Sequence, residues 1–228
     1  MNETLKRKEP TKRPINFSVQ LSEDQKIAKD VVLNSRVSII TGFAGSGKST
    51  LTSQIALDLM LSKKMYESIA ITRPTIKAID TNEIGHLPGS INEKLLPYTY
   101  PILNSFKKLL YKQKQKSSAD EQIKKLMEEE KIIVLPIQFM RGLNIDDQIL
   151  IVEECQNITT PQLELILTRL GKNGKIIFCG DINQCDIKPH QSGMIKLFDL
   201  ADKVDGINLC ELTTNHRDPL VTEILKHF

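Results

Sequence analysis

The chain of 228 residues is 40% hydrophobic and 26% charged, and its net charge of +3 permits nucleic-acid binding without requiring it. Its length suits one well-buried α/β domain, and no apolar run reaches the roughly 20 residues needed to span a bilayer. The basic, polar N-terminus is not that of a secretory signal. The spacing of the cysteines suits no metal site and predicts reduced thiols in a cytoplasmic protein; they are Cys155, Cys179, Cys185 and Cys210.

The first residues, 1–14, are charged and contain proline, which predicts a disordered basic arm followed by a single domain over 15–228. The stretch 22–34 is typical of a helix capped by Ser22. Continuous apolar strands that alternate with helices predict an α/β fold, a mostly parallel sheet with helices on both faces. Further helices are expected at 49–61 and 160–171, and buried strands at 37–41, 68–72, 131–136, 148–153 and 175–180.

A highly charged segment at about 98–130 interrupts this alternation and predicts a helical insertion, either a hairpin or a mobile element. It contains the basic run KKLLYKQKQK, with Lys112, Lys114 and Lys116 near its end. Such a run is either a solvated helix face or a contact surface for nucleic-acid phosphates.

The sequence between the strand at 37–41 and the helix at 49–61 fits the phosphate-binding pattern G-x-x-x-x-G-K-[ST] without a mismatch. Glycines in such a loop let backbone N–H groups point at phosphate oxygens, and the helix N-terminus adds positive potential. Lys48 would place its charge on the outer phosphates, and the Ser49 hydroxyl would ligate Mg²⁺. The predicted nucleotide-binding residues are Gly42, Phe43, Ala44, Gly45, Ser46, Gly47, Lys48, Ser49 and Thr50.

Two adjacent carboxylates, Glu153 and Glu154, close a predicted buried strand, where unpaired charge is costly. If that strand is a neighbour of the strand before the phosphate loop, the carboxylates lie beside the loop. Glu153 would then hold Mg²⁺ through water, and Glu154 would polarise the attacking water; solvated acids at a strand end are the alternative. Gln184 follows another strand end and either hydrogen-bonds the γ-phosphate or belongs, with Asp181, to a simple polar turn.

The ordered motifs resemble the PhoH-like family of P-loop ATPases, relatives of the superfamily 1 helicases. The matching pieces are GFAGSGKST, ITRP, GHLPGSINEKLLPYTYP, FMRGLNI, IVEECQN, LTRLGKNGK, GDINQCD, SGM and NHRDPLV. Glu153 and Cys155 depart from the family's usual Asp-Glu-Ala-Gln, and Asp218 stands where the family usually has His. The resemblance implies a RecA-like P-loop NTPase domain.

The resemblance also implies roles for residues outside the phosphate loop. Gln25 resembles the glutamine that reads adenine in related helicases, which would favour ATP; otherwise it is a surface helix residue. Thr72 and Arg73 lie where the helicases contact the nucleic-acid backbone, although Arg73 could equally be a strand-end charge. Arg217 matches the family's late arginine, which neutralises charge on the transferring phosphoryl group.

From these residues we expect Mg²⁺-dependent ATP hydrolysis coupled to RNA or single-stranded DNA, with Lys48, Glu154, Gln184 and Arg217 as catalytic residues. The alternative is an ATP-dependent conformational switch that binds a protein partner and hydrolyses slowly. A kinase is a weaker third hypothesis, because no acceptor site is evident.

Only one phosphate loop is present, and the chain is too short for two RecA-like domains. A lone domain leaves one side of the nucleotide open to water, which weakens electrostatic contacts there. We therefore expect a homo-oligomeric ring, such as a hexamer, in which Arg217 acts on a neighbour's nucleotide. The same composition predicts a cytoplasmic protein that does not associate with membranes.

Overall fold

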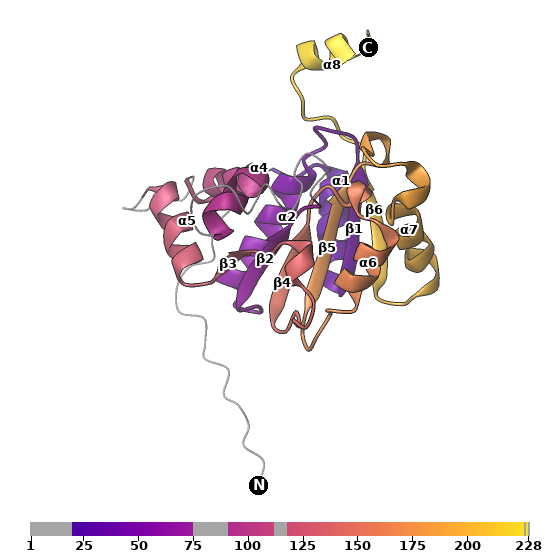
Figure 1. The fold of residues 1–228 in the computed structure, drawn as a ribbon. Coiled ribbons are helices and arrows are strands. Elements are labelled where there is room, and N and C mark those ends of the chain that lie inside the picture. Colours follow the sequence, from indigo (N-terminus) through magenta and orange to yellow (C-terminus); the bar gives the residue numbers. More distant parts are fainter. Residues whose placement is uncertain (1–19, 75–90, 112–117, 226, 228) are drawn as a thin grey trace.

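A computed structural model describes residues 20–74, 91–111, 118–225 and 227 (Figure 1). Within them, six parallel strands form one sheet in the order β3-β2-β4-β5-β1-β6. The five strands predicted from apolar runs are all present, and the predicted arm at 1–14 lies outside the described residues. The strands are β1 (Val37–Gly42), β2 (Ser68–Thr72), β3 (Ile132–Val134), β4 (Gln148–Val152), β5 (Lys175–Gly180) and β6 (Ile207–Leu212).

The edge strand β6 was not expected from the sequence. It pairs with β1 alone, and most of its side chains are exposed or half-buried, so that only Leu212 at its end is fully buried. Its residues therefore do not form the continuous apolar run by which a strand buried on both faces is recognised.

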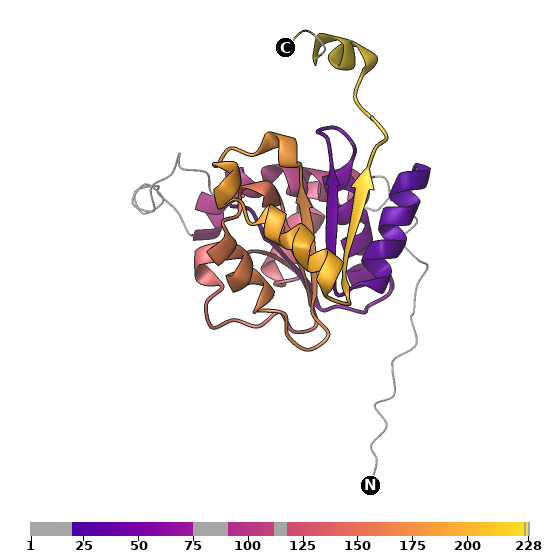
Figure 2. The ribbon, with the colours of Figure 1, turned by 90° about the vertical axis from the view of Figure 1, so that its right-hand side faces the viewer.

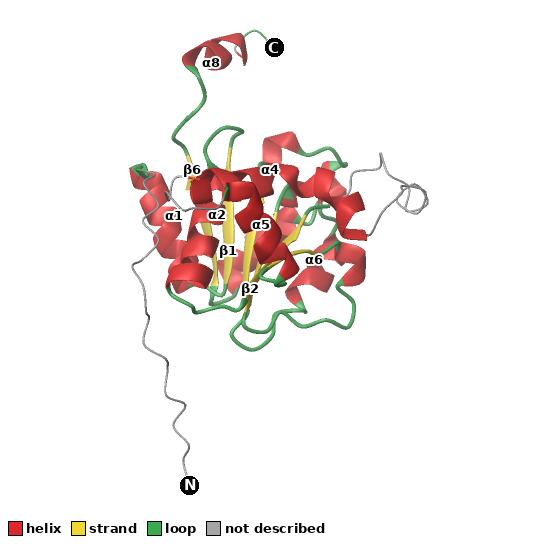
Figure 3. Ribbon diagram, turned by 90° about the vertical axis from the view of Figure 1, so that its left-hand side faces the viewer, coloured by secondary structure: helices red, strands yellow, loops and turns green. Residues whose placement is uncertain are grey.

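Helices cover both faces of the sheet, as predicted. Figure 3 shows α2, α4 and α5 in front of the strands, and Figure 2 shows the opposite face, covered by the orange helices α6 and α7. Because neighbouring side chains of a strand point to opposite faces, Ile40 joins the core under α1 and α2, whereas Ile39 joins the core under α6 and α7. The helices are α1 (Glu23–Asn34), α2 (Lys48–Leu57), α4 (Ile91–Tyr111), α5 (Ala119–Glu128), α6 (Thr160–Leu167), α7 (Met194–Lys203) and α8 (Pro219–Leu225).

The segment predicted as an insertion at about 98–130 contains most of α4 and all of α5. α4 begins before the expected boundary, and Ile102, Leu103 and Phe106 are buried in the same core cluster as the apolar face of α2. These two helices therefore belong to the layer that covers the sheet. Lys112, Lys114 and Lys116 lie outside the described residues.

The short helix α8 stands apart from the rest of the chain in all three ribbon views (Figures 1–3). Its apolar residues Leu220, Val221 and Ile224 are exposed. In the described part of the chain, no helix is both long and apolar enough to cross a bilayer.

Candidate nucleotide-binding site

The phosphate-loop sequence lies at the carboxyl end of β1, where the chain turns into α2. Gly42, Gly45 and Gly47 have φ angles of 142°, 94° and 88°, a region that side chains with a Cβ rarely adopt. The loop therefore takes this shape only with glycine at these positions. Lys48, the first residue of α2, folds its Nζ back onto the carbonyl oxygens of Gly42 at 2.5 Å and Phe43 at 3.1 Å.

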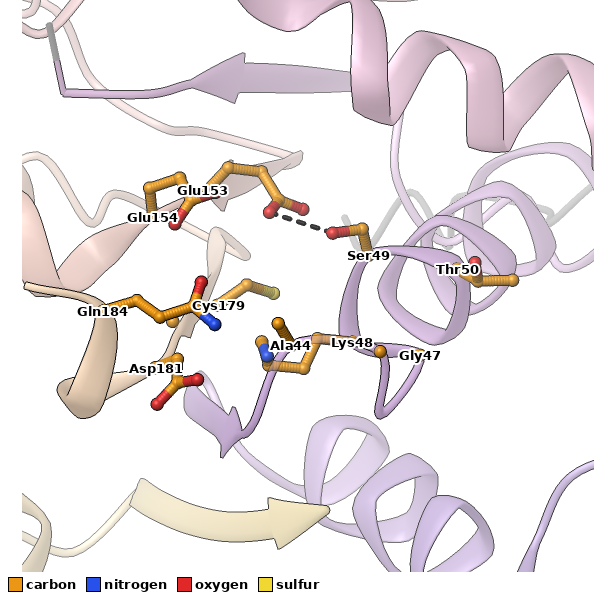
Figure 4. A pocket seen from close by; sticks show the side chains of 12 residues that line it. Ala44, Gly47, Lys48, Ser49, Thr50, Glu153, Glu154, Cys179, Asp181 and Gln184 are labelled. Carbon is orange, nitrogen blue, oxygen red and sulfur yellow. Dashed lines mark hydrogen bonds between the residues drawn. The ribbon is translucent and has the colours of Figure 1, made fainter. Parts of the chain in front are cut away.

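Beside the loop lies a cavity of about 280 Å³. This volume is just below the range of roughly 300–1,000 Å³ that is usual for ligand pockets. Figure 4 shows the acidic pair on one side of the cavity, with Gln184 and Asp181 below it, and the start of α2 with Ser49 on the other side. Its lining residues are Ala44, Gly45, Gly47, Lys48, Ser49, Thr50, Glu153, Glu154, Cys179, Gly180, Asp181 and Gln184.

The strand before the acidic pair is not a neighbour of β1, contrary to the assumption made from the sequence. β5 lies between β4 and β1. Glu153 nevertheless spans that gap, and its Oε2 accepts a hydrogen bond of 3.0 Å from the Ser49 hydroxyl, drawn as the dashed line in Figure 4. The predicted meeting of acidic pair and phosphate loop therefore occurs across one intervening strand.

The carboxylate of Glu153 has the chemistry that a cation would require of a ligand. Burial raises the pKa of this carboxyl to about 7, an effect that neighbouring Glu154 adds to and the Ser49 hydrogen bond opposes. The second oxygen, Oε1, is buried and has no hydrogen-bond partner. A buried, unpaired carboxylate oxygen beside a hydroxyl fits Mg²⁺, which is commonly held by one or two carboxylates together with substrate phosphates.

That donor set is small. Among the residues that the structure describes, no group of three or more His, Cys, Asp or Glu side chains could hold a metal ion. Ser49 and Glu153 would therefore supply the protein's ligands, and phosphate oxygens and water the remainder.

Both carboxylate oxygens of Glu154 are already engaged. Oε1 lies 3.4 Å from Nη2 of Arg73, and Oε2 accepts a hydrogen bond of 2.7 Å from Nε2 of Gln156. The backbone of Glu154 is left-handed, with φ 52° and ψ 42°. A non-glycine residue in that region is uncommon and is found preferentially at functional sites.

Arg73 connects this carboxylate to a second, smaller cavity of about 50 Å³ next to α4. Glu153 and Glu154 line both cavities, so the acidic pair forms the wall between them. The neighbouring Thr72 is buried, with only 1% of its surface exposed. Of the two predicted nucleic-acid contacts, therefore, Arg73 is half-buried beside Glu154, and the Thr72 side chain does not reach the surface.

Gln184 and Asp181 lie on the wall of the main cavity formed by the end of β5. The Asp181 carboxylate accepts a hydrogen bond from the Asn183 amide, which fixes the turn, and the Gln184 side chain is exposed. The two buried thiols, Cys155 and Cys179, have pKa values raised above the ordinary range by burial, which keeps them neutral beside Glu153.

Gln25 does not lie on the surface of α1, which was the alternative to the adenine-reading role expected from the resemblance. It is only 6% exposed, and its amide is used internally. Nε2 donates to the Ser46 carbonyl at 3.2 Å and lies 3.0 Å from Nε2 of His216, while Oε1 accepts from the Ser22 amide at 3.3 Å. In this arrangement Gln25 supports the back of the phosphate loop.

Arg217 lies on the phosphate loop of its own chain. A Cβ at Gly45 would come within 2.7 Å of Arg217 Nε, and the amide of His216 donates to the Gly45 carbonyl at 3.1 Å. His216 has no expected role from the sequence, since its spacing from the other histidines is not that of a metal site. Its position just before Arg217 was the one available signal.

Comparison with known proteins agrees with this geometry. The profile of the family described as "PhoH-like protein" matches residues 19–228. A PhoH-like protein of Bacillus subtilis is 35% identical over 190 residues, which cover 82% of this chain and 56% of that protein. One from Synechocystis is 33% identical over 195 residues, 84% of this chain and 56% of its own length.

A solved structure with low sequence identity has a similar fold. The large terminase of a thermophilic bacteriophage superposes with a TM-score of 0.57 at 11% identity, covering 91% of this chain and 50% of the terminase. That likeness, with the parallel sheet, confirms the predicted RecA-like P-loop NTPase fold. The chain spans about half the length of the curated relatives it matches. From its sequence profile, relatives and phosphate-loop geometry, the chain belongs to the PhoH-like family of P-loop proteins.

Proposed function

We propose that this chain hydrolyses ATP with Mg²⁺ and couples hydrolysis to RNA or single-stranded DNA. The observation that carries the proposal is the contact between Ser49 and Glu153, with the unpaired Oε1 of Glu153 buried at the wall of the phosphate-loop cavity. A P-loop with a cation site and a second carboxylate, Glu154, is the set of groups that phosphoryl transfer to water requires.

Each residue has a separate task in this scheme. The glycine-rich loop directs backbone N–H groups at the phosphates, and Lys48 leaves its two carbonyl partners to meet the outer phosphates. Bound Mg²⁺ would neutralise charge that develops on the phosphate oxygens. Glu154 orients the attacking water and accepts its proton, and Gln184, which lines the same cavity, hydrogen-bonds the γ-phosphate.

Arg73 supports the coupling to nucleic acid. It follows β2 at the carboxyl ends of the strands, where the cavity lies. Its guanidinium contacts the carboxylate of Glu154, which would orient water. A backbone phosphate that drew the guanidinium away would release Oε1 of Glu154 for catalysis. Nucleic acid would thereby raise the rate of hydrolysis.

We expect single-stranded RNA or DNA to increase ATP turnover by the wild-type protein and to have a much smaller effect on Arg73→Gln. The measurement is steady-state phosphate release with and without a panel of single- and double-stranded RNA and DNA. The stimulation should weaken steeply with added salt, because phosphate contacts release counterions. The matched control is Lys172→Gln, which removes an exposed charge just before β5, at the amino ends of the strands and away from the cavity. This variant should respond like wild type.

One observation favours the second hypothesis, a nucleotide-dependent switch that binds a protein partner. Both oxygens of Glu154 are engaged, an arrangement that would keep hydrolysis slow. A wild-type turnover that no nucleic acid changes, but that a protein partner raises, would favour this switch over the nucleic-acid motor.

A homo-oligomeric ring is the proposed assembly. The exposed Leu220, Val221 and Ile224 of α8 offer an apolar surface for a second copy. We expect light scattering to give a mass several times that of one chain. Replacing these three residues by serine should lower that mass, and a monomeric wild-type protein with full turnover would refute the ring.

A further inference from the structure

The carboxylate of Asp24, in the first turn of α1, binds a segment almost two hundred residues away. It accepts hydrogen bonds from the amides of Thr213 and Thr214, both 2.8 Å from Oδ2, and from the Thr214 hydroxyl at 3.0 Å from Oδ1. The Ser22 hydroxyl also donates to it. Asp24 therefore fastens the chain to α1 directly after β6 ends.

Helix α1 is itself firmly placed. Ala28 and Val32 are completely buried against the sheet. At the far end of the helix, the Lys175 ammonium donates to the carbonyl oxygens of Val32, at 2.5 Å, and of Ser35, and so ties α1 to β5. Because α1 is fixed to the core of the domain, the backbone that Asp24 binds is fixed to the core as well.

The segment that Asp24 fastens continues onto the phosphate loop. Two residues after Thr214, the His216 amide binds the Gly45 carbonyl, and the Arg217 side chain covers Gly45. Gly47 is covered in the same way, since a Cβ there would meet Nε2 of Gln25 at 2.7 Å. The phosphate loop is therefore contacted at Gly45 and Gly47 by α1 and by residues 213–217, which from here on are called the post-β6 segment.

We propose that Asp24 is a positioning residue that seats the post-β6 segment so that Arg217 serves the nucleotide bound to its own subunit. The role of Arg217 in hydrolysis rests on the proposed function, whereas the contact between Asp24 and the segment does not. This assignment reverses the expectation from the sequence, in which Arg217 served a neighbouring subunit.

The chemistry at this position calls for an ionised aspartate. The backbone amides of Gln25, Thr213 and Thr214 all donate to it and cannot accept, and an ionised carboxylate accepts at every lone pair. Burial would raise the pKa of Asp24, but the hydrogen bonds from the Ser22 hydroxyl and the two threonines outweigh it and hold that pKa well below its usual range. Because these amides lie on both carboxylate oxygens, with Gln25 on Oδ1 and the two threonines on Oδ2, asparagine would turn its NH₂ donor toward at least one of them.

The first test is a double-mutant cycle on ATP turnover with Asp24→Asn and Arg217→Ala. We expect Asp24→Asn to lower kcat by about 10- to 100-fold, since a small misplacement of a catalytic group can cost about 10²-fold, with little change in KM. In the Arg217→Ala background the same substitution should have no further effect. An unchanged kcat, or an equal loss in both backgrounds, would overturn the proposal.

Two variants separate positioning from general stability. Asp30→Asn removes an exposed carboxylate from the same helix and should leave kcat and the melting temperature unchanged. Asp24→Glu retains the charge and should recover part of the lost kcat. Suppose that Asp24→Asn lowers kcat, that Asp24→Glu recovers none of it, and that both variants are unfolded. Asp24 would then serve the fold alone.

Mixing experiments test whether Arg217 acts on the nucleotide of its own subunit or on that of a neighbouring subunit. Lys48→Ala and Arg217→Ala, each strongly impaired alone, are combined in equal amounts under conditions that exchange subunits. If Arg217 serves its own subunit, no active site in the mixture is complete and turnover stays at the mean of the two variants. Restored turnover would assign Arg217 to a neighbour and overturn the proposal.

Hydrogen exchange gives a readout that is independent of hydrolysis. Asp24→Asn should speed exchange of the amides of the post-β6 segment without changing exchange in β4 or β5, and unchanged exchange there would contradict the anchoring. Failure of the proposed function would look different. Wild-type turnover would then equal that of Lys48→Ala, while the exchange difference between wild type and Asp24→Asn would persist.

Discussion

Lys48→Ala will remove ATP hydrolysis while the domain stays folded. The ammonium of Lys48 is the only cationic group that lines the phosphate-loop cavity within the described residues. A charge-assisted contact of this kind contributes about 1.5–3 kcal/mol to simple binding, and loss of one preorganised contact to the transition state costs about 10²–10³-fold in kcat. We expect weaker ATP binding and a turnover at least that much slower.

The fold should tolerate this change because the partners of Lys48 remain accessible. Its Nζ contacts the carbonyls of Gly42 and Phe43, in a loop that borders the cavity, so water can replace the ammonium. Circular dichroism and the melting temperature check the fold, and phosphate release checks turnover. Lys63→Ala removes an exposed lysine beyond α2 and is the control. A folded Lys48→Ala protein with wild-type turnover would refute the site.

Glu154→Gln will retain ATP binding and nearly stop hydrolysis. The substitution preserves size and the amide oxygen can still accept a hydrogen bond, but the group can no longer take a proton from water. General base catalysis contributes about 10²–10⁴-fold, and we expect a loss of that order in kcat with an unchanged affinity for ATP. Single-turnover phosphate release together with equilibrium nucleotide binding measures the two quantities separately.

The neighbouring carboxylate provides the matched comparison. Glu153→Asp keeps the charge beside Ser49 and restores the more usual residue, so turnover should equal or exceed that of wild type. The shorter side chain also leaves room for a water molecule between carboxylate and cation. Normal hydrolysis by Glu154→Gln, with loss of hydrolysis in Glu153→Asp, would show that the two carboxylates have exchanged roles.

The sequence predicted the parts of the site that local patterns encode. The phosphate loop, the strand before it and the helix after it obey short-range rules of glycine conformation and apolar periodicity, and all three lie where expected. The approach of Glu153 to Ser49 was also anticipated, but through the wrong strand order, because sequence alone does not say that β5 separates β1 from β4.

The post-β6 segment was harder to foresee for a physical reason. Asp24 has a sufficient local explanation, since an acidic residue in the first turn of a helix is stabilised by the helix dipole. That explanation gives no hint of its bonds to Thr213 and Thr214. Likewise, β6 is half-exposed along one edge and carries no strong apolar signal, so nothing in the sequence indicated where the chain after it would lie.

The position of β5 fixes the width of the site. Two hydrogen-bonded strand spacings of about 4.8 Å each separate β1 from β4 by about 10 Å. β5 ends at Gly180, where a Cβ would come within 2.6 Å of both Cys155 Sγ and Gln156 Oε1, so a side chain at this position would displace the segment that follows the acidic pair. The separation between the two halves of the site is therefore set by backbone hydrogen bonds, and side-chain substitutions in the loop leave that separation unchanged.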